Sequence, residues 1–462
     1  MKKPLLLHAF CLALALSIGS TFASAQTAAP ADAPAPADIA TDDAALLDEL
    51  SQRSFRFFTE QVGEETGLVA DRAAADGSNR FAVASIASTG FGLTALCVAD
   101  ERGWTEPGEA LAQVRKTLRF VHDELPHVKG FYYHFVDIDT GERAWDSELS
   151  SIDTALLIAG VLHARAYFDD AEIDELATNI YERVDWQWMT NGGETLTMGW
   201  KPESGFLPYR WDSHSELYHM VLMAIGSPTH PLPAEAWDAI TRHPFTYGDF
   251  EYVQCHALFT HQYPWAWVDV DGMRDDHMNY FENSRIATLA QRQMCIDNAD
   301  QFSGWGPDMW GLTSCDGPEG YRGWMGGPDL IDKVDGLLTP CAATGSIVFA
   351  PVECKAAIRA MYDRYGEHIW KHYGFVDAFY PDPTLGPADA KGWVAPDVIG
   401  IDVGITLLMI ENEKDGVVWR TSMKDPDLQR ALKAVGFRPD IEDEQDEEAN
   451  GDPEHTRDHA RM

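Results

Sequence analysis

Apolar residues recur along most of the chain at the three- to four-residue spacing of one face of an α-helix. The run that contains Leu46, Leu47, Leu50, Phe57 and Phe58 is typical of such an amphipathic helix. The same pattern predicts further helices over 81–98, 107–122, 151–168, 173–184, 215–225, 274–298, 352–365, 403–412 and 426–435. Pro107 and Pro351 are expected at helix starts, where a proline costs no hydrogen bond.

Long segments rich in Gly, Trp and Asp separate these helices, notably 195–210 and 302–338. Short β-branched strands do not alternate with the helices, so a β/α barrel is the weaker interpretation. Roughly ten to twelve helices with elaborate loops favour an all-α fold of paired helices closed into a toroid. Functional groups are then expected on loops and helix starts at one mouth.

The two ends of the chain differ from its middle. Residues 1–25 have the basic start, apolar run and small-residue cleavage site of a signal peptide, which indicates a periplasmic or secreted protein. Its apolar run is too short for a membrane span. Residues 26–43 are an expected Ala/Pro-rich linker, 44–439 one catalytic domain, and 440–462 an acidic disordered tail.

The charge balance narrows the classes of ligand. The 462 residues include 35 Lys and Arg against 74 Asp and Glu, a formal net charge of −39. Nucleic acids, anionic membranes and polyuronates are therefore poor partners, because binding them needs clustered cations. The 15 Trp, 15 Tyr and 21 Phe instead favour neutral, hydroxyl-rich ligands. A monomer is expected.

Little in the sequence supports a metal or a cofactor. Six cysteines follow the signal segment without a Cys-x-x-Cys pair, so one to three disulfides and buried free thiols are both open. The Gly-x-Gly-x-x-Ala match at 90–95 lacks a preceding strand, which favours helix packing over dinucleotide binding. The acidic turn at 269–275 does not have EF-hand spacing, and there is no Gly-x-Ser-x-Gly elbow.

Carboxylates flanked by aromatic residues are the strongest chemical signal. Asp146, Glu148 and Asp153 crowd the predicted start of the helix at 151–168. Helix capping could explain Asp146 or Ser150, but it explains Asp153 less well, because that residue lies almost one turn inside.

A second acidic position is Glu216, which would lie three or four residues into a helix capped by Asp212 or Ser213. A capping box is the alternative role for this glutamate. A third is Asp402, before the apolar run 405–410, where it could equally be an N-cap.

Residues beside these carboxylates are candidates for sugar binding. Tryptophans in Gly/Pro-rich loops make good platforms for pyranose rings, although core packing is an equal alternative. The expected substrate-binding residues are Tyr209, Arg210, Trp211, His214, Trp305, Trp310, Trp324 and Trp393, together with Asp146, Glu148 and Asp153.

Two carboxyl groups in an aromatic-lined cleft are what cleavage of a glycosidic bond requires. One must be protonated to help the leaving group depart, and the other activates water or attacks directly. Burial beside apolar rings and other carboxylates raises the pKa of a carboxyl, which supplies the acid without a cofactor.

Together these segments resemble the glycoamylase-like family of α/α toroids, and within it the secreted endo-β-1,2-glucanases of glycoside hydrolase family 144. The resemblance covers residues 47–437. It is carried by the segments 148–157, 216–218, 224–231, 373–379, 400–402, 410–412 and 418–419.

The resemblance implies an (α/α)6 barrel and anomer-inverting hydrolysis of β-1,2-glucan to oligosaccharides such as sophorose. Glu216 would be the general acid and Asp402 the base-side residue, with no cofactor and no metal. Related members act from chain ends or on cyclic glucans. Two competing functions are a polysaccharide lyase that uses Tyr218 with His214 or His256, and a glycan-binding protein without activity.

Overall fold

The computed structural model describes Ile39, residues 41–323 and residues 325–440. Helices are its main elements. They are α1 (Asp43–Glu60), α2 (Ile86–Arg102), α3 (Glu109–Asp123), α4 (Ser151–Tyr167), α5 (Ala171–Glu182), α6 (Trp186–Met189), α7 (Tyr218–Gly226), α8 (Glu235–Asp238), α9 (Phe259–Gln262), α10 (Tyr280–Asp297), α11 (Pro340–Thr344), α12 (Pro351–Ile369), α13 (Gly400–Asp415), α14 (Val417–Ser422) and α15 (Pro426–Ala434), with the 3-10 turns η2 (Tyr263–Trp265) and η3 (Pro328–Lys333).

The strands are two to four residues long and lie in the connections between helices. All their pairings are antiparallel: β1 (Arg72–Ala74) with β16 (Asp397–Ile399), β2 (Val83–Ser85) with β5 (Phe135–Asp137), β3 (His127–Val128) with β4 (Phe131–Tyr132), β6 (Leu149–Ser150) with β7 (Gly199–Lys201) and then β8 (Gly205–Phe206), β9 (Pro244–Tyr247) with β10 (Phe250–Val253), β11 (Met273–Arg274) with β17 (Arg438–Pro439), β12 (Cys315–Gly317) with β13 (Gly320–Arg322), and β14 (Trp370–Lys371) with β15 (Gly374–Phe375). These short strand pairs belong to the loops and do not form a layer.

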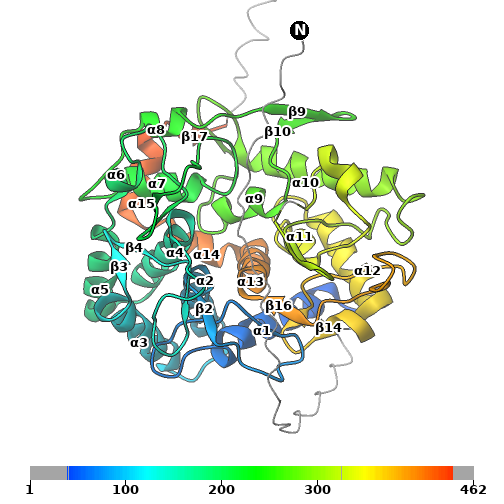
Figure 1. The fold of residues 1–462 in the computed structure, drawn as a ribbon, viewed down its shortest axis with the longest axis horizontal. Helices are drawn as coiled ribbons and strands as arrows, with labels where there is room; N and C mark the ends of the chain where they lie inside the picture. The colour runs from blue at the N-terminus through cyan, green and yellow to red at the C-terminus, as the bar shows by residue number, and fades with distance from the viewer. Residues whose placement is uncertain (1–38, 40, 324, 441–462) are drawn as a thin grey trace, which may run out of the picture.

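The helices form an inner and an outer group (Figure 1). Among the inner helices α13 contacts α2, α2 contacts α4, α4 contacts α7, and α7 contacts η2. Gln262 of α9 then donates to the Ala342 carbonyl oxygen of α11 at 2.9 Å, and α11 returns to α13. The outer helices α1, α3, α5, α10, α12 and α15 pack outside these neighbours. The fold is thus mostly helical, as predicted.

The closest helix contact is between α2 and α4. A Cβ atom on Gly90 would lie 2.1 Å from the Leu156 carbonyl oxygen, and one on Gly160 would lie 2.0 Å from the Gly90 carbonyl oxygen. Only glycine lets the two backbones approach so closely. The glycines at 90–95 therefore serve helix packing, as expected, and the dinucleotide-binding alternative is excluded because the segment lies within a helix.

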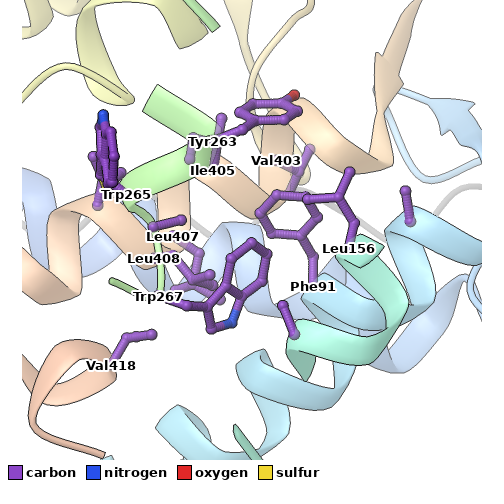
Figure 2. Packing of buried hydrophobic residues seen from close by; sticks show 14 of the residues in the cluster. Phe91, Leu156, Tyr263, Trp265, Trp267, Val403, Ile405, Leu407, Leu408 and Val418 are labelled. Atoms are coloured by element: carbon purple, nitrogen blue, oxygen red, sulfur yellow. The ribbon is translucent and has the colours of Figure 1, made fainter. Parts of the chain in front are cut away.

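Aromatic rings fill the space between the inner helices (Figure 2). The ring centroid of Phe91 lies 5.6 Å from that of Tyr263 and 4.9 Å from that of Trp267. Gly404 of α13 makes room for Phe91, because a Cβ atom there would lie 2.5 Å from its ring. This aromatic core supports Tyr263, whose hydroxyl group reaches the site described below.

Several predicted boundaries needed correction. Glu109, not Pro107, begins α3, after the left-handed Gly108, whereas Pro351 begins α12 as expected. The helix expected from 215 begins at Tyr218, and the one expected from 274 begins at Tyr280. The very short α6, α8, α9 and α11 were not predicted, because four or five residues show no helical period.

Helix α1 begins at Asp43 after the N-cap Asp42, and the domain bounds 44–439 stay a prediction. The predicted signal peptide, most of the linker and the acidic tail lie outside the described residues. In the described part of the chain, no helix is both long and apolar enough to cross a membrane. Six cysteines are described, and all are buried free thiols, so the disulfide alternative is not supported.

Candidate active site

Glu216 lies in the turn just before α7, so it is not inside the helix as expected. The N-cap of α7 is Leu217, which makes no side-chain cap, and the capping-box role for Glu216 is thereby excluded. The residue is half-buried and its carboxyl group is surrounded by protein. Burial, with the nearby Asp153 charge, raises the pKa of Glu216 to about 7. At neutral pH this carboxyl is therefore protonated in a large part of the molecules.

Asp402 lies in the first turn of α13, whose N-cap is Ile399 without a side-chain cap. The N-cap alternative for Asp402 is therefore excluded. Its Oδ1 accepts a hydrogen bond from the Tyr263 hydroxyl at 3.2 Å. Burial raises the pKa of Asp402 to about 6, although hydrogen bonds from Asp377 and Tyr263 work against this.

Asp377 and Asp402 are hydrogen-bonded to each other through their side chains. Such a bond requires one shared proton. Burial and the Asp402 charge raise the pKa of Asp377 well above its usual range, so the proton belongs mainly to Asp377. Its Oδ2 also accepts a hydrogen bond from the Asp316 backbone amide at 2.6 Å. Both side chains border a cavity of about 20 Å³, enough for one water molecule.

Arg72 connects this pair to the other carboxylates. Its guanidinium lies 3.0 Å from Asp71 and 2.7 Å from Asp316. The pairing of β1 with β16 fixes this position, since the Gly400 amide at the start of α13 donates to the Asp71 carbonyl oxygen at 2.7 Å. Backbone contacts therefore fix the position of Asp402 relative to Arg72.

A second group of charges surrounds His134. Its Nδ1 lies 3.2 Å from Oε1 of Glu148, and its Nε2 lies 3.4 Å from Oδ1 of Asp153. Burial alone would lower the pKa of His134, but Asp153 and Glu148 outweigh it and raise that pKa to about 9. Burial opposes ionisation of Glu148 as well, yet its hydrogen bond with His134 lowers the pKa of Glu148 to about 2. The imidazolium and the Glu148 carboxylate thus form an ion pair.

Asp153 completes this cluster from the first turn of α4. Ser150 is the N-cap, and its Oγ both accepts from the Asp153 amide and donates to the Asp153 carboxylate. Burial raises the pKa of Asp153, against the lowering effect of His134. The Asp153 charge also acts on Glu216, so the cluster lies close to the predicted acid.

Four of the expected substrate contacts are corrected by their surroundings. Trp211, Trp305 and Trp310 keep 3%, 5% and 0% of their surface exposed, so their rings pack in the core and cannot stack on a sugar. Trp211 instead donates to Ser151 Oγ at the start of α4. His214 is also buried, between the Tyr218 hydroxyl at 2.9 Å and His261. Trp305 and Trp310 were predicted from their Gly-rich segments, whereas Trp211 and His214 were predicted because they lie beside Glu216 in the sequence.

The other predicted contacts divide into different environments. Arg210 is committed to the carbonyl oxygens of Thr195 and Thr190, at 2.5 and 2.9 Å, which is a structural role. Asp146 and Tyr209 are exposed, and Trp393 is half-buried. Trp324 lies outside the described residues.

His134, Asp377 and Tyr321 are functional candidates that the sequence reasoning did not select. Tyr321 keeps 42% of its surface exposed on the β12–β13 hairpin. Burial of its hydroxyl and the charges of Asp402 and Asp377 raise the pKa of Tyr321 far above its usual range, which places the hydroxyl near those carboxyls. Asp377 stood inside the 373–379 segment of the family resemblance, and that was the available signal.

Among the described residues, no group of three or more His, Cys, Asp or Glu side chains could hold a metal ion. The acidic turn at 269–275 has a structural role through Asp275. Asp275 is buried there and accepts hydrogen bonds from Trp237 Nε1 at 2.6 Å and the Tyr280 hydroxyl at 2.7 Å.

Comparison with known proteins shows which folds and sequences are similar to this chain. The model of the Glycoamylase family matches residues 208–426, a little less than half of the chain. An endo-β-1,2-glucanase from Chitinophaga pinensis, solved with sophorotriose and glucose, is 25% identical, with a TM-score of 0.79 over 86% of this chain and 99% of that one. A glucoamylase from Hormoconis resinae, at 11% identity and a TM-score of 0.51 over 86% of this chain and 78% of that one, shares the fold alone.

A curated relative is the exo β-1,2-glucooligosaccharide sophorohydrolase (non-reducing end) of Parabacteroides distasonis. It is 24% identical over 433 residues, which are 85% of this chain and 58% of the relative. The chain thus spans little more than half of that protein. The fold and these matches together show that the chain is similar to the glycoamylase-like proteins. It is structurally similar to an endo-β-1,2-glucanase and similar in sequence to an exo sophorohydrolase.

Proposed function

We propose that the protein is a glycoside hydrolase that cleaves β-1,2-linked glucan with inversion at the anomeric carbon. The observation that carries the proposal is Glu216, a carboxyl with a pKa of about 7 and no role in helix capping. Such a group can give its proton to the bridging sugar oxygen at neutral pH. The linkage rests on the similarity to the β-1,2-glucanase and the sophorohydrolase.

Asp402 acts on the base side. Once ionised, it accepts a proton from the attacking water, while Tyr263 and the protonated Asp377 hold its carboxylate in place. Inverting glycosidases use this pair of roles, with the two carboxyls on opposite sides of the scissile bond. We infer that the contacts around the inner helices close an (α/α)6 barrel, with Glu216 and Asp402 at its mouth.

The residues proposed to abstract a proton in a polysaccharide lyase, Tyr218 and His214, are not accessible to a substrate. Tyr218 is fully buried and bonded to His214, so neither reaches a substrate. His256 is engaged with Asp329 at 3.0 Å. The glycan-binding alternative remains an outcome of the test below.

The test is incubation with linear β-1,2-, β-1,3- and β-1,4-glucans, followed by sizing of the products. Release of mixed oligosaccharides from β-1,2-glucan alone supports endo action, whereas sophorose alone from the first time points indicates exo action. Glu216→Gln should abolish release, and Asp212→Asn, an exposed neighbour, should not. Binding of glucan without any turnover would overturn the proposal in favour of a glycan-binding protein.

A further inference from the structure

Trp145 is the most exposed tryptophan that the structure describes, with 59% of its surface open to solvent. A single exposed apolar side chain is common on protein surfaces, so the significance of Trp145 depends on its surroundings. The residue is absent from the binding residues that the sequence predicts, although its neighbour Asp146 is among them.

The backbone at this point is strained. Trp145 and Asp146 have φ angles of 54° and 50°, two of the four positive values found among the described non-glycine residues. Strain of this kind persists only where the surroundings impose it, and it is frequent at binding sites.

Arg143 holds the strained turn in place. Its Nε donates to the Ser147 carbonyl oxygen at 2.6 Å and its Nη2 to the Asp146 carbonyl oxygen at 2.7 Å. The Ala144 amide donates to the Phe135 carbonyl oxygen at 3.0 Å, which ties the turn to β5. The ring is therefore presented by an ordered segment.

A chain of ring contacts joins Trp145 to the candidate active site. Its ring centroid lies 5.0 Å from that of Phe135, and Phe135 stacks on His134 at 3.8 Å. His134 in turn contacts Glu148 and Asp153, and the Asp153 charge acts on Glu216. Trp145 thus lies at the edge of the same site, on the Glu216 side.

We propose that Trp145 is a platform on which a glucosyl ring of a β-glucan oligosaccharide stacks. The apolar C–H face of the sugar covers the indole, and the exposed Asp146 carboxylate next to it can accept hydrogen bonds from the sugar hydroxyls. A neutral sugar suits this acidic surface better than an anionic ligand. The inference rests on the proposed function, because it takes its substrate class from there.

The test uses the inactive Glu216→Gln protein, so that oligosaccharides bind without being cleaved. Affinities for β-1,2-, β-1,3- and β-1,4-gluco-oligosaccharides of increasing length are measured by calorimetry, with and without Trp145→Ala. The substitution should weaken binding of the longer cognate oligosaccharides by about 10-fold, the loss of one aromatic contact. Trp145→Phe should restore most of it, because a phenyl ring also offers a face.

The matched control is Val352→Ala, which removes exposed apolar surface from α12 and should leave the affinity unchanged. In the active enzyme Trp145→Ala should raise KM with little change in kcat, and an unchanged melting temperature shows that the fold is intact. Equal affinities with and without Trp145 would overturn the platform alone. If the Glu216→Gln protein binds none of the oligosaccharides, the proposed function and the platform both fail.

Discussion

Nε2 of His134 lies 3.4 Å from Oδ1 of Asp153. This contact makes a histidine the positive centre of an acidic cluster, and the pKa of about 9 means that His134 stays charged at neutral pH. The same charge keeps Glu148 ionised, with a pKa of about 2.

The stability of the protein should therefore depend on pH through His134. The folded pKa of about 9 exceeds the unfolded value, so the contribution is complete below about pH 6.5 and disappears as pH rises through 9. Across this window the free energy of unfolding should fall by about 1–3 kcal/mol in the wild type, and less in His134→Gln. Denaturant titrations at pH 6.5 and 9.5 measure the difference. Equal falls in both proteins would refute the role of His134.

The rate should follow a bell-shaped pH profile. Asp402 must be ionised, so kcat/KM should decrease as pH falls below about 6, and Glu216 must be protonated, so kcat/KM should decrease as pH rises above about 7. Because Asp377 and Asp402 share a proton, the acidic limb belongs to the pair. Initial rates on β-1,2-glucan from pH 4 to 9 provide the profile, and a rate still rising at pH 9 would contradict Glu216 as the acid.

Asp377 should control the acidic limb of that profile. In Asp377→Asn the side-chain amide still donates to Asp402 and still accepts from the Asp316 backbone amide. Activity should therefore persist, and the midpoint of the acidic limb should lie about one pH unit lower. Asp377→Leu removes the hydrogen-bond donor to Asp402, which should move the midpoint of the acidic limb to higher pH and reduce kcat. Asp389→Asn, an exposed position, is the control. An identical profile for all three variants would show that Asp377 does not act on Asp402.

Gly90→Ala should destabilise the protein severely. The added methyl group would lie 2.1 Å from the Leu156 carbonyl oxygen, and backbone atoms of α2 and α4 must then move apart. A loss of about 1–3 kcal/mol or more is expected. Gly306→Ala is the control, because its added Cβ meets no atom within 4 Å. Thermal unfolding of both variants measures the difference. Equal melting temperatures would show that Gly90 is not needed for the packing of α2 against α4.

The long helices could be predicted from the sequence because their apolar period is sustained. The helix from Ser151, for example, was predicted within one residue at each end. The starts of α7 and α10 were placed too early, since polar residues before a helix look the same whether they cap it or form a turn. The positions of Glu216 and Asp402 came from such helix starts and from the family resemblance.

The remainder of the site depends on contacts between distant segments. Asp377 meets Asp402 only because β16 and the 373–379 loop come together, and His134 meets Asp153 through pairing of loop segments. The exposure of the tryptophan rings could not be predicted for a similar reason. Trp310 and Trp145 both stand in polar, irregular segments, yet one ring has no exposure and the other has 59%, and only the three-dimensional path of the backbone decides which.

The crossing of α2 and α4 has a consequence for how such an enzyme can diversify. Because peptide groups rather than side chains touch there, the spacing of these two helices is set by Gly90 and Gly160 and cannot be tuned by exchanging one apolar residue for another. The position of α4, which carries Asp153, is therefore fixed relative to α2. A preference for longer, shorter or cyclic chains would have to be acquired by replacing surface segments such as the turn at 141–147, and grafting that turn between relatives is a direct route to altered specificity.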